Sequence, residues 1–155
     1  MRALMAGVCV AAGLTIGVIG AASVASADPW VDYTPMTGVW QKTLVHVEPN
    51  RIDDYLIALK KTWVPQQEAA KKHGLIDSYF VQIAVDSDTA GPNVLLGIHY
   101  VSMAVLDPNK DRDMAMQKEA EKAMPKAALT SEMGERAKYR SVVSSRLWTG
   151  VDLTK

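Results

Sequence analysis

Apolar and polar residues alternate along several segments of the chain in the pattern of β-strands. Residues 39–47 are rich in β-branched side chains and end at Glu48-Pro49-Asn50, which predicts a first strand. Residues 75–85 and 94–101 repeat with a period of two on either side of a polar turn that contains Gly91-Pro92, which predicts a hairpin. Residues 141–148 predict a last strand.

Between the first and second predicted strands, apolar side chains recur every three or four residues, as in an amphipathic helix. They are Ile52, Tyr55, Leu56, Leu59 and Trp63. Asn50 is the predicted N-cap, His73-Gly74 is the predicted end, and Pro65 predicts a kink or break because proline has no amide hydrogen.

A second helical segment is predicted over residues 111–124, where Pro125 stops or bends it. A short further helix is expected to begin at a cap provided by Thr130 or Ser131 and to run to Lys138. The order of the main elements is therefore strand, helix, strand, strand, helix, strand.

The N-terminus has the pattern of a signal peptide. Arg2 is followed by an uncharged run over residues 3–24 and by Ala25-Ser26-Ala27, which suits cleavage after residue 27. We therefore expect residues 1–27 to be a signal peptide and the mature protein to be periplasmic or secreted. The alternative is a retained membrane anchor, because the run is almost long enough to cross a bilayer. In that case this segment alone would contact the membrane.

After the leader, the chain has the length of one domain, with an extended arm over residues 28–38 and a single domain over residues 39–155. The only cysteine, Cys9, lies in the leader, so the mature part has no thiol for a disulfide, a nucleophile or a metal ligand. Lys and Arg together number 17, and so do Asp and Glu. Without a concentrated basic face, nucleic acid is not an expected partner.

The element order predicts an α+β fold of the ferredoxin-like βαββαβ type, with an antiparallel sheet and helices on one face. The other face also carries apolar side chains, which are either Trp40, Leu44, Phe80 and Ala84 or their neighbours along the strands. Exposure of so apolar a sheet face to water is unfavourable, so a second layer is expected to cover it. A second copy of the chain is the simplest source of that layer. The sequence thus predicts a symmetric homodimer.

Three segments resemble the dimeric α/β barrel superfamily: residues 45–51, Trp63-Val64-Pro65 with Gly74, and residues 78–85. The resemblance spans most of residues 39–148 and implies two ferredoxin-like subunits that pack sheet against sheet. Members include cofactor-independent monooxygenases, haem-degrading enzymes, lactone isomerases and modules with no known activity. The resemblance therefore implies a fold without choosing a reaction.

His46 and His99 lie on predicted strands, and a neutral imidazole that faces a cavity can act as a general base. For each of them the alternative is a ring that is hydrogen-bonded at a sheet edge or dimer seam. His73 is explained by its place in the last turn of a helix. The spacing of the histidines does not suit a metal, so we expect neither a metal nor a bound cofactor.

Five further residues are candidates for ligand binding. Arg146 can hold a carboxylate and Gln82 can orient a polar group, although an ordinary ion pair also explains the arginine. We expect an apolar pocket between sheet and helices, lined by Trp63, Tyr79, Tyr100 and His99. A place in the core is the alternative for Trp63.

Three functional hypotheses follow. The first is an exported module that binds a small apolar or aromatic ligand or a partner. The second is a cofactor-independent monooxygenase or isomerase in which His46 or His99 moves a proton. The third is a haem-binding or haem-degrading protein with a histidine ligand. The sequence leaves open whether the protein is an enzyme.

Overall fold

The computed structural model describes residues 26–85 and 90–154, and the predicted leader lies outside them except for its last two residues. Its main sheet is antiparallel, with the strand order β3-β4-β2-β5. The strands are β2 (Val39–Val47), β3 (Ile76–Ile83), β4 (Val94–Tyr100) and β5 (Arg140–Trp148). This is the ferredoxin-like order, so the predicted fold class is confirmed.

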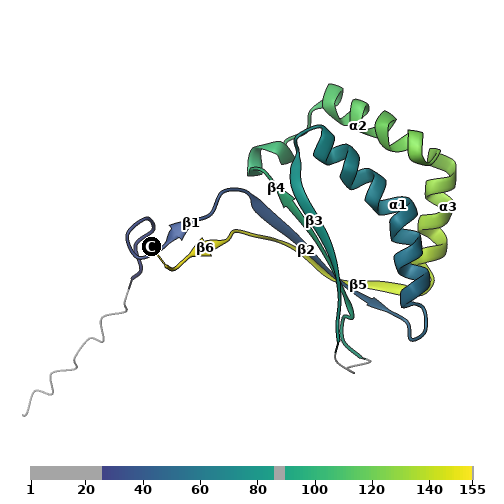
Figure 1. Ribbon diagram of the computed structural model, residues 1–155, viewed down its shortest axis with the longest axis horizontal. Helices are drawn as coiled ribbons and strands as arrows, with labels where there is room; N and C mark the ends of the chain where they lie inside the picture. Colours follow the sequence, from purple (N-terminus) through teal and green to yellow (C-terminus); the bar gives the residue numbers. More distant parts are fainter. Residues whose placement is uncertain (1–25, 86–89, 155) are drawn as a thin grey trace, which may run out of the picture.

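Three helices lie together on one side of this sheet (Figure 1): α1 (Ile52–Lys72), α2 (Lys110–Ala123) and α3 (Lys126–Ala137). Of the kink or break predicted at Pro65, the break is wrong, because α1 continues through this residue. Its buried stripe runs on both sides of the proline, from Tyr55 and Leu59 to Ala69 and Ala70. Packing of this stripe against the sheet outweighs the one backbone hydrogen bond that proline cannot make.

The helix starts differ from those predicted. Asn50 adopts a positive φ of 63° in the turn before α1, and Arg51 is the N-cap instead. Asparagine tolerates this left-handed conformation better than most residues, which explains its place in the turn. The third helix begins directly after Pro125 and not at Thr130 or Ser131, and the Thr130 hydroxyl donates to Lys126 O inside the helix.

Three short elements were not predicted. A 3₁₀ helix, η1 (Met103–Leu106), connects β4 to α2. The N-terminal arm forms β1 (Thr34–Pro35), which pairs antiparallel with β6 (Val151–Asp152) near the C-terminus. This two-stranded ribbon continues the β2–β5 pair beyond the sheet and projects away from the helices (Figure 1).

The core lies between α1 and the sheet. One buried cluster joins Val45 and Val47 of β2 to Tyr55 and Leu59 of α1, and Leu96 of β4 completes it. A second cluster surrounds Ile76 at the start of β3, where Leu75 and Ala70 are buried against it. Together these clusters fix the helix layer on the sheet and leave space beside them near η1.

Candidate functional site

A cavity of about 340 Å³ lies between the sheet, α1 and the η1–α2 segment, and we call it the η1–α2 cavity. Its walls are mostly apolar side chains from all three layers. They are Ala70, Leu75, Ile76, Ile98, Val105, Leu106 and Met116. The polar lining groups are Gln66, Gln67, Tyr100, Arg112 and Asp113. An apolar cavity with a few polar groups is the usual form of a small-molecule site.

Tyr100 places a hydroxyl in the cavity wall at the end of β4. The hydroxyl donates to Gln41 Oε1 on β2 at 2.9 Å, and Gln41 Nε2 in turn donates to Ser145 Oγ on β5 at 3.1 Å. Burial raises the pKa of Tyr100, so the phenol stays protonated at neutral pH. Tyr100 is therefore a fixed, neutral wall group with acceptor capacity left on its oxygen.

Gln67 is the least satisfied polar group of the cavity. Its residue is only 8% exposed, on the face of α1 that looks toward the sheet. Among the described residues, the one hydrogen bond of its side chain runs from Nε2 to Trp63 O at 3.4 Å, near the limit for such a bond. A carboxamide can make about four hydrogen bonds, so Gln67 keeps both donor and acceptor capacity for a ligand.

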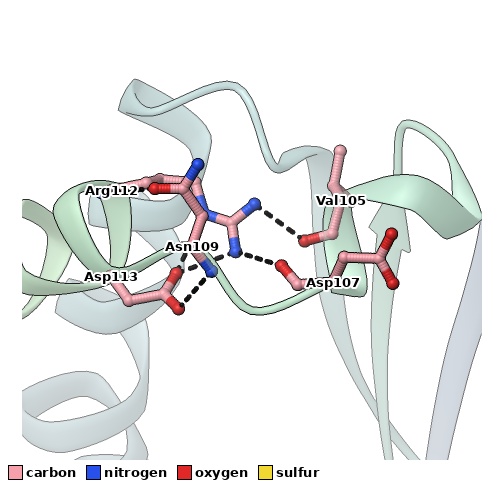
Figure 2. Close-up of polar contacts among 5 residues, drawn as sticks. All are labelled: Val105, Asp107, Asn109, Arg112 and Asp113. Atoms are coloured by element: carbon pink, nitrogen blue, oxygen red, sulfur yellow. Dashed lines mark hydrogen bonds and ion pairs between the residues drawn. The ribbon is translucent and has the colours of Figure 1, made fainter.

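Arg112 holds the η1–α2 connection in place (Figure 2). Its Nη1 donates to Val105 O at 3.0 Å and its Nη2 to Asp107 O at 2.9 Å. Its Nε donates to Asp113 Oδ1 at 2.9 Å, and Asp113 Oδ2 accepts from the Asn109 amide. These bonds lower the pKa of Asp113, Arg112 contributing most. The guanidinium is thus used to shape the cavity rim.

A second hollow of about 340 Å³ lies where α1, α2 and α3 meet. It shares Gln66, Asp113 and Met116 with the η1–α2 cavity, so the two are neighbours along the α1–α2 seam. Its walls include Ala69, Ala120, Met124 and Leu129. Methionine side chains adapt to different shapes, so this seam can adjust to a ligand.

Trp63 and Tyr79 contact each other on the helix side of the sheet, with ring centroids 5.3 Å apart and planes at 88°. The Tyr79 hydroxyl donates to Glu68 Oε1 at 2.5 Å, and this bond is the main reason that the pKa of Tyr79 rises to about 12. Neither residue lines the two hollows. Of the four residues expected in one pocket, only Tyr100 lines the η1–α2 cavity.

His99 lies on the opposite face of the sheet, which corrects the expectation that it shares a pocket with Tyr100. Successive side chains of β4 alternate between faces, so His99 joins Trp40, at a centroid distance of 4.7 Å. Its Nδ1 lies 2.7 Å from Asp77 Oδ1. A carboxylate only accepts, so His99 Nδ1 is the donor in this bond, and Nε2 is the ring nitrogen that the bond leaves open.

His46 and His99 are not brought together. Trp40 pairs with His99, whereas His46 lies six positions further along β2, about 20 Å away at the usual rise of a strand. The Nδ1 of His46 is 2.7 Å from Gly91 O, which matches the alternative of a hydrogen-bonded ring at the sheet end. Gln82 pairs with Leu95 near the same end.

Arg146 lies on β5 directly opposite Lys42 of β2. Lys42 Nζ is 5.9 Å from the centre of the Trp148 ring, so these side chains share the sheet face that bears Trp40. Among the described residues, neither cation forms an ion pair. The ion pair proposed as an alternative for Arg146 is therefore not formed within the described chain.

Sequence reasoning missed the residues that connect distant segments. Gln67 and Met116 belong to predicted helices, but nothing in one sequence shows that α2 and η1 close over β4. Asp77 meets His99 only through the β3–β4 register. A signal existed for Asn109, because an asparagine before a helical segment is a common cap, and its side chain accepts from the Arg112 amide.

Within residues 26–85 and 90–154, no group of three or more His, Cys, Asp and Glu side chains is arranged to hold a metal ion. No helix in this part of the chain is long and apolar enough to span a membrane.

The chain matches no family model and no curated protein. Among solved structures it is similar to a dimeric ferredoxin-like protein from an uncultured marine organism, with a TM-score of 0.43 and 11% identity over 77% of this chain and 91% of that one. HapK from Hahella chejuensis gives a TM-score of 0.44 and 8% identity over 71% and 90% of the two chains. A dimeric ferredoxin-like protein of unknown function from Thermobifida fusca gives 0.38 and 11% over 74% and 90%.

The ferredoxin-like fold rests on the strand order of the sheet and not on these similarities. They do not indicate a substrate or a reaction, because a fold of this kind hosts many activities.

Proposed function

We propose that this protein is an exported module that binds a small molecule in the η1–α2 cavity. The observation that carries the proposal is Gln67, a nearly buried residue whose carboxamide has unused hydrogen-bonding capacity at a cavity of about 340 Å³ with mainly apolar lining residues. That volume is at the lower end of the range for small-molecule sites. Export rests on the signal-peptide pattern of residues 1–27.

The lining groups define the class of ligand. The Arg112 guanidinium already donates to two carbonyls and to Asp113, so it is not available to bind an anion. Gln67 and Tyr100 are neutral groups in an apolar wall. The cavity therefore suits a small, uncharged apolar or aromatic compound with one polar end, which would bond to the Gln67 carboxamide.

We also propose that the protein works as a homodimer in which the open face of each sheet packs against the other. Trp40, Phe80 and His99 form an aromatic cluster on this face, and Trp148 on β5 remains 50% exposed. Aromatic side chains gathered on a sheet face favour an apolar partner over water. A dimer of this kind leaves the η1–α2 cavity free, because the cavity lies on the other side of the sheet.

A fluorescent apolar probe tests the cavity directly. The mature chain, residues 28–155, is titrated with 1-anilinonaphthalene, and Val105→Trp is compared with Met103→Trp. Val105 lines the cavity, whereas Met103 lies in the same 3₁₀ helix, does not line the cavity and is 57% exposed. We expect Val105→Trp to weaken probe binding at least about tenfold and Met103→Trp to leave it unchanged.

Gln67→Leu tests whether the Gln67 carboxamide bonds to the ligand. Mass spectrometry of the mature protein under native conditions identifies any compound that co-purifies with it, and Gln67→Leu is expected to lose that compound while the apolar probe still binds. Equal probe affinity in wild type and Val105→Trp would remove the cavity as the ligand site.

A second candidate function is a cofactor-independent enzyme that uses His99 as a base. The specific observation is the Asp77 carboxylate 2.7 Å from Nδ1, which orients the ring and leaves Nε2 to accept a proton. Such a site would lie on the open face and not in the η1–α2 cavity. Loss of turnover of a co-purified compound in His99→Gln at unchanged melting temperature would support it, whereas a lower melting temperature alone would indicate a structural histidine.

A further inference from the structure

Both ends of the described chain meet in one projecting element. We call residues 28–37 together with residues 150–154 the terminal ribbon; it contains β1 and β6 and is held by the Met36 amide, which donates to Gly150 O at 2.9 Å. Figure 1 shows that it extends away from the helices and the sheet. Its apolar side chains are largely exposed, with Trp30 at 72%, Val31 at 74% and Leu153 at 74%. Such a surface indicates a contact with another molecule.

The terminal ribbon is acidic. Its carboxylates are Asp28, Asp32 and Asp152, and the described residues 26–38 and 149–154 contain no Lys or Arg. Asp152 accepts from the Thr154 amide and hydroxyl and pairs with no cation in the described chain. Asp32 accepts from the Asp28 nitrogen at 2.7 Å, and in the mature chain this nitrogen is the α-amino group, so that the remaining negative charge of the ribbon comes from Asp28 and Asp152. The ribbon therefore presents negative charge beside exposed apolar groups.

The open face of the sheet has the opposite character at the root of this ribbon. Trp40 lies opposite Trp148, and two residues further along the strands Lys42 lies opposite Arg146. We call these four residues the basic–aromatic patch. Like charges directly opposite each other on a sheet destabilise it, and no carboxylate of the described chain offsets these two.

We propose that the terminal ribbon of each copy docks on the basic–aromatic patch of a second copy of this chain. The ribbon supplies carboxylates and exposed apolar groups, and the patch supplies cations and indole rings, so the two surfaces are complementary in both respects. Both lie on the same chain, so a twofold arrangement covers two ribbons and two patches at once.

The geometry favours a second copy over the ribbon's own subunit. The ribbon continues β2 and β5 past the end of the sheet, which directs it away from its own patch (Figure 1). Beyond the short β1–β6 pair, residues 28–33 fold back into a turn in which the Trp30 amide donates to Tyr33 O at 2.7 Å. The ribbon therefore ends in a compact projecting tip that a partner can receive. The inference rests on the proposed sheet-to-sheet dimer and adds which segments close it.

Charge reversal tests this contact in the mature chain. A patch variant carries Lys42→Glu and Arg146→Glu, and a ribbon variant carries Asp32→Lys and Asp152→Lys. By sedimentation velocity, each variant alone is expected to raise the dimer dissociation constant at least about tenfold, because like charges then face each other in the contact. Lys60→Glu with Lys61→Glu, on the exposed surface of α1, is the control and is expected to dimerise like the wild type.

Mixing the two variants gives the decisive result. In a heterodimer, the acidic ribbon of the patch variant meets the unchanged patch of the other copy, and the basic ribbon meets the acidic patch. The equimolar mixture is therefore expected to form dimers with a dissociation constant within about fivefold of the wild type. Circular dichroism and melting temperatures of the separate variants show that each one is folded.

Three results would overturn the inference. A single chain that carries all four substitutions is compared with the mixture. If this chain recovers the dissociation constant of the wild type and the mixture does not, the ribbon contacts its own subunit. If both separate variants dimerise like the wild type, the ribbon is not part of the interface, although the dimer proposal stands. A wild-type monomer would remove the dimer and this inference together, while probe binding to the η1–α2 cavity would still decide the proposed ligand site.

Discussion

The two faces of the sheet consist of the same strands, but only one is covered within a single copy. On the helix face, Val45 and Val47 are fully buried against α1. On the open face, Leu44 and His46 alternate with them and are only half-buried. The strands thus carry apolar side chains for two layers, and one copy of the chain supplies only one of them.

The polar groups on the two faces differ as well. The helix face hides neutral groups such as Gln67 and Tyr100 beside a cavity, whereas the open face bears Lys42 and Arg146 without acidic partners in the described chain. A cavity whose charged lining groups, Arg112 and Asp113, already pair with each other suits a small uncharged ligand. Paired cations beside indole rings suit a macromolecular surface with carboxylates. This difference is the basis for proposing a ligand site on the helix face and an assembly surface on the open face.

Truncating one leucine on each face gives the largest expected difference. Leu59 is 2% exposed in the core on α1, and we expect Leu59→Ala to lower the free energy of unfolding by about 3 kcal/mol. Leu44→Ala on the open face should cost about 1 kcal/mol or less in the monomer, because that side chain still contacts water. Urea denaturation at low protein concentration measures both. Equal losses would mean that the open face is already packed in one copy.

Gly38 lies at the root of the terminal ribbon, directly before β2. It has a φ of 75°, and an added Cβ would lie 2.5 Å from Tyr100 O and 2.6 Å from His99 Nε2. Gly74 has a φ of 71° with nothing within 4 Å. We expect Gly38→Ala to destabilise by about 2–3 kcal/mol and Gly74→Ala by about 1 kcal/mol, the difference being the cost of the clash. Similar melting temperatures for the two variants would contradict this close packing.

Hydroxyl deletion compares a wall group of the cavity with a surface tyrosine. Tyr100→Phe leaves Gln41 Oε1 without its donor in a half-buried site, so we expect a loss of about 1 kcal/mol in the free energy of unfolding. Tyr79→Phe removes an exposed bond to Glu68 and should cost less than about 0.5 kcal/mol. Chemical denaturation at neutral pH distinguishes them. A larger loss in the free energy of unfolding for Tyr79→Phe than for Tyr100→Phe would contradict the assignment of Tyr100 to the half-buried site and Tyr79 to the exposed one.

A pH titration tests the Asp77–His99 pair on the open face. The hydrogen bond from His99 is the main reason that the pKa of Asp77 lies below its ordinary value of 3.8. Because the folded-state pKa is lowered, the stabilisation is present above about pH 4 and disappears as the pH falls through the folded pKa. We expect the melting temperature of the wild type to fall as the pH drops through this acidic range, and that of Asp77→Asn to fall less. Identical profiles would show that the pair does not form in solution.

The fold was predictable because its strands carry a strong local signal. The first strand, Val39–Val47, was predicted with its observed bounds, and the alternation of β3 placed Tyr79 and Phe80 on opposite faces, as the structure has them. The errors at Pro65 and Asn50 have one physical origin. Local propensity decided the prediction, whereas packing of α1 and the turn before it decided the structure.

The site was less predictable because its parts come from separate elements. Tyr100 was predicted as a pocket residue from its strand, but Gln67 and Arg112 depend on how η1 and α2 close over the sheet. The terminal ribbon joins segments more than 100 residues apart in the sequence, and two-residue strands leave no periodic pattern. Pairings of this kind follow from tertiary contacts and not from local sequence.

Sedimentation equilibrium of the mature chain, residues 28–155, tests the central claim most directly. If the open face of the sheet is an assembly surface, the wild type is a dimer at roughly micromolar concentration and dissociates on dilution or when Trp40 and Trp148 are both changed to serine. The helix face and its cavity would remain folded in that variant. A wild-type chain that stays monomeric and folded at concentrations of several hundred micromolar would contradict the account.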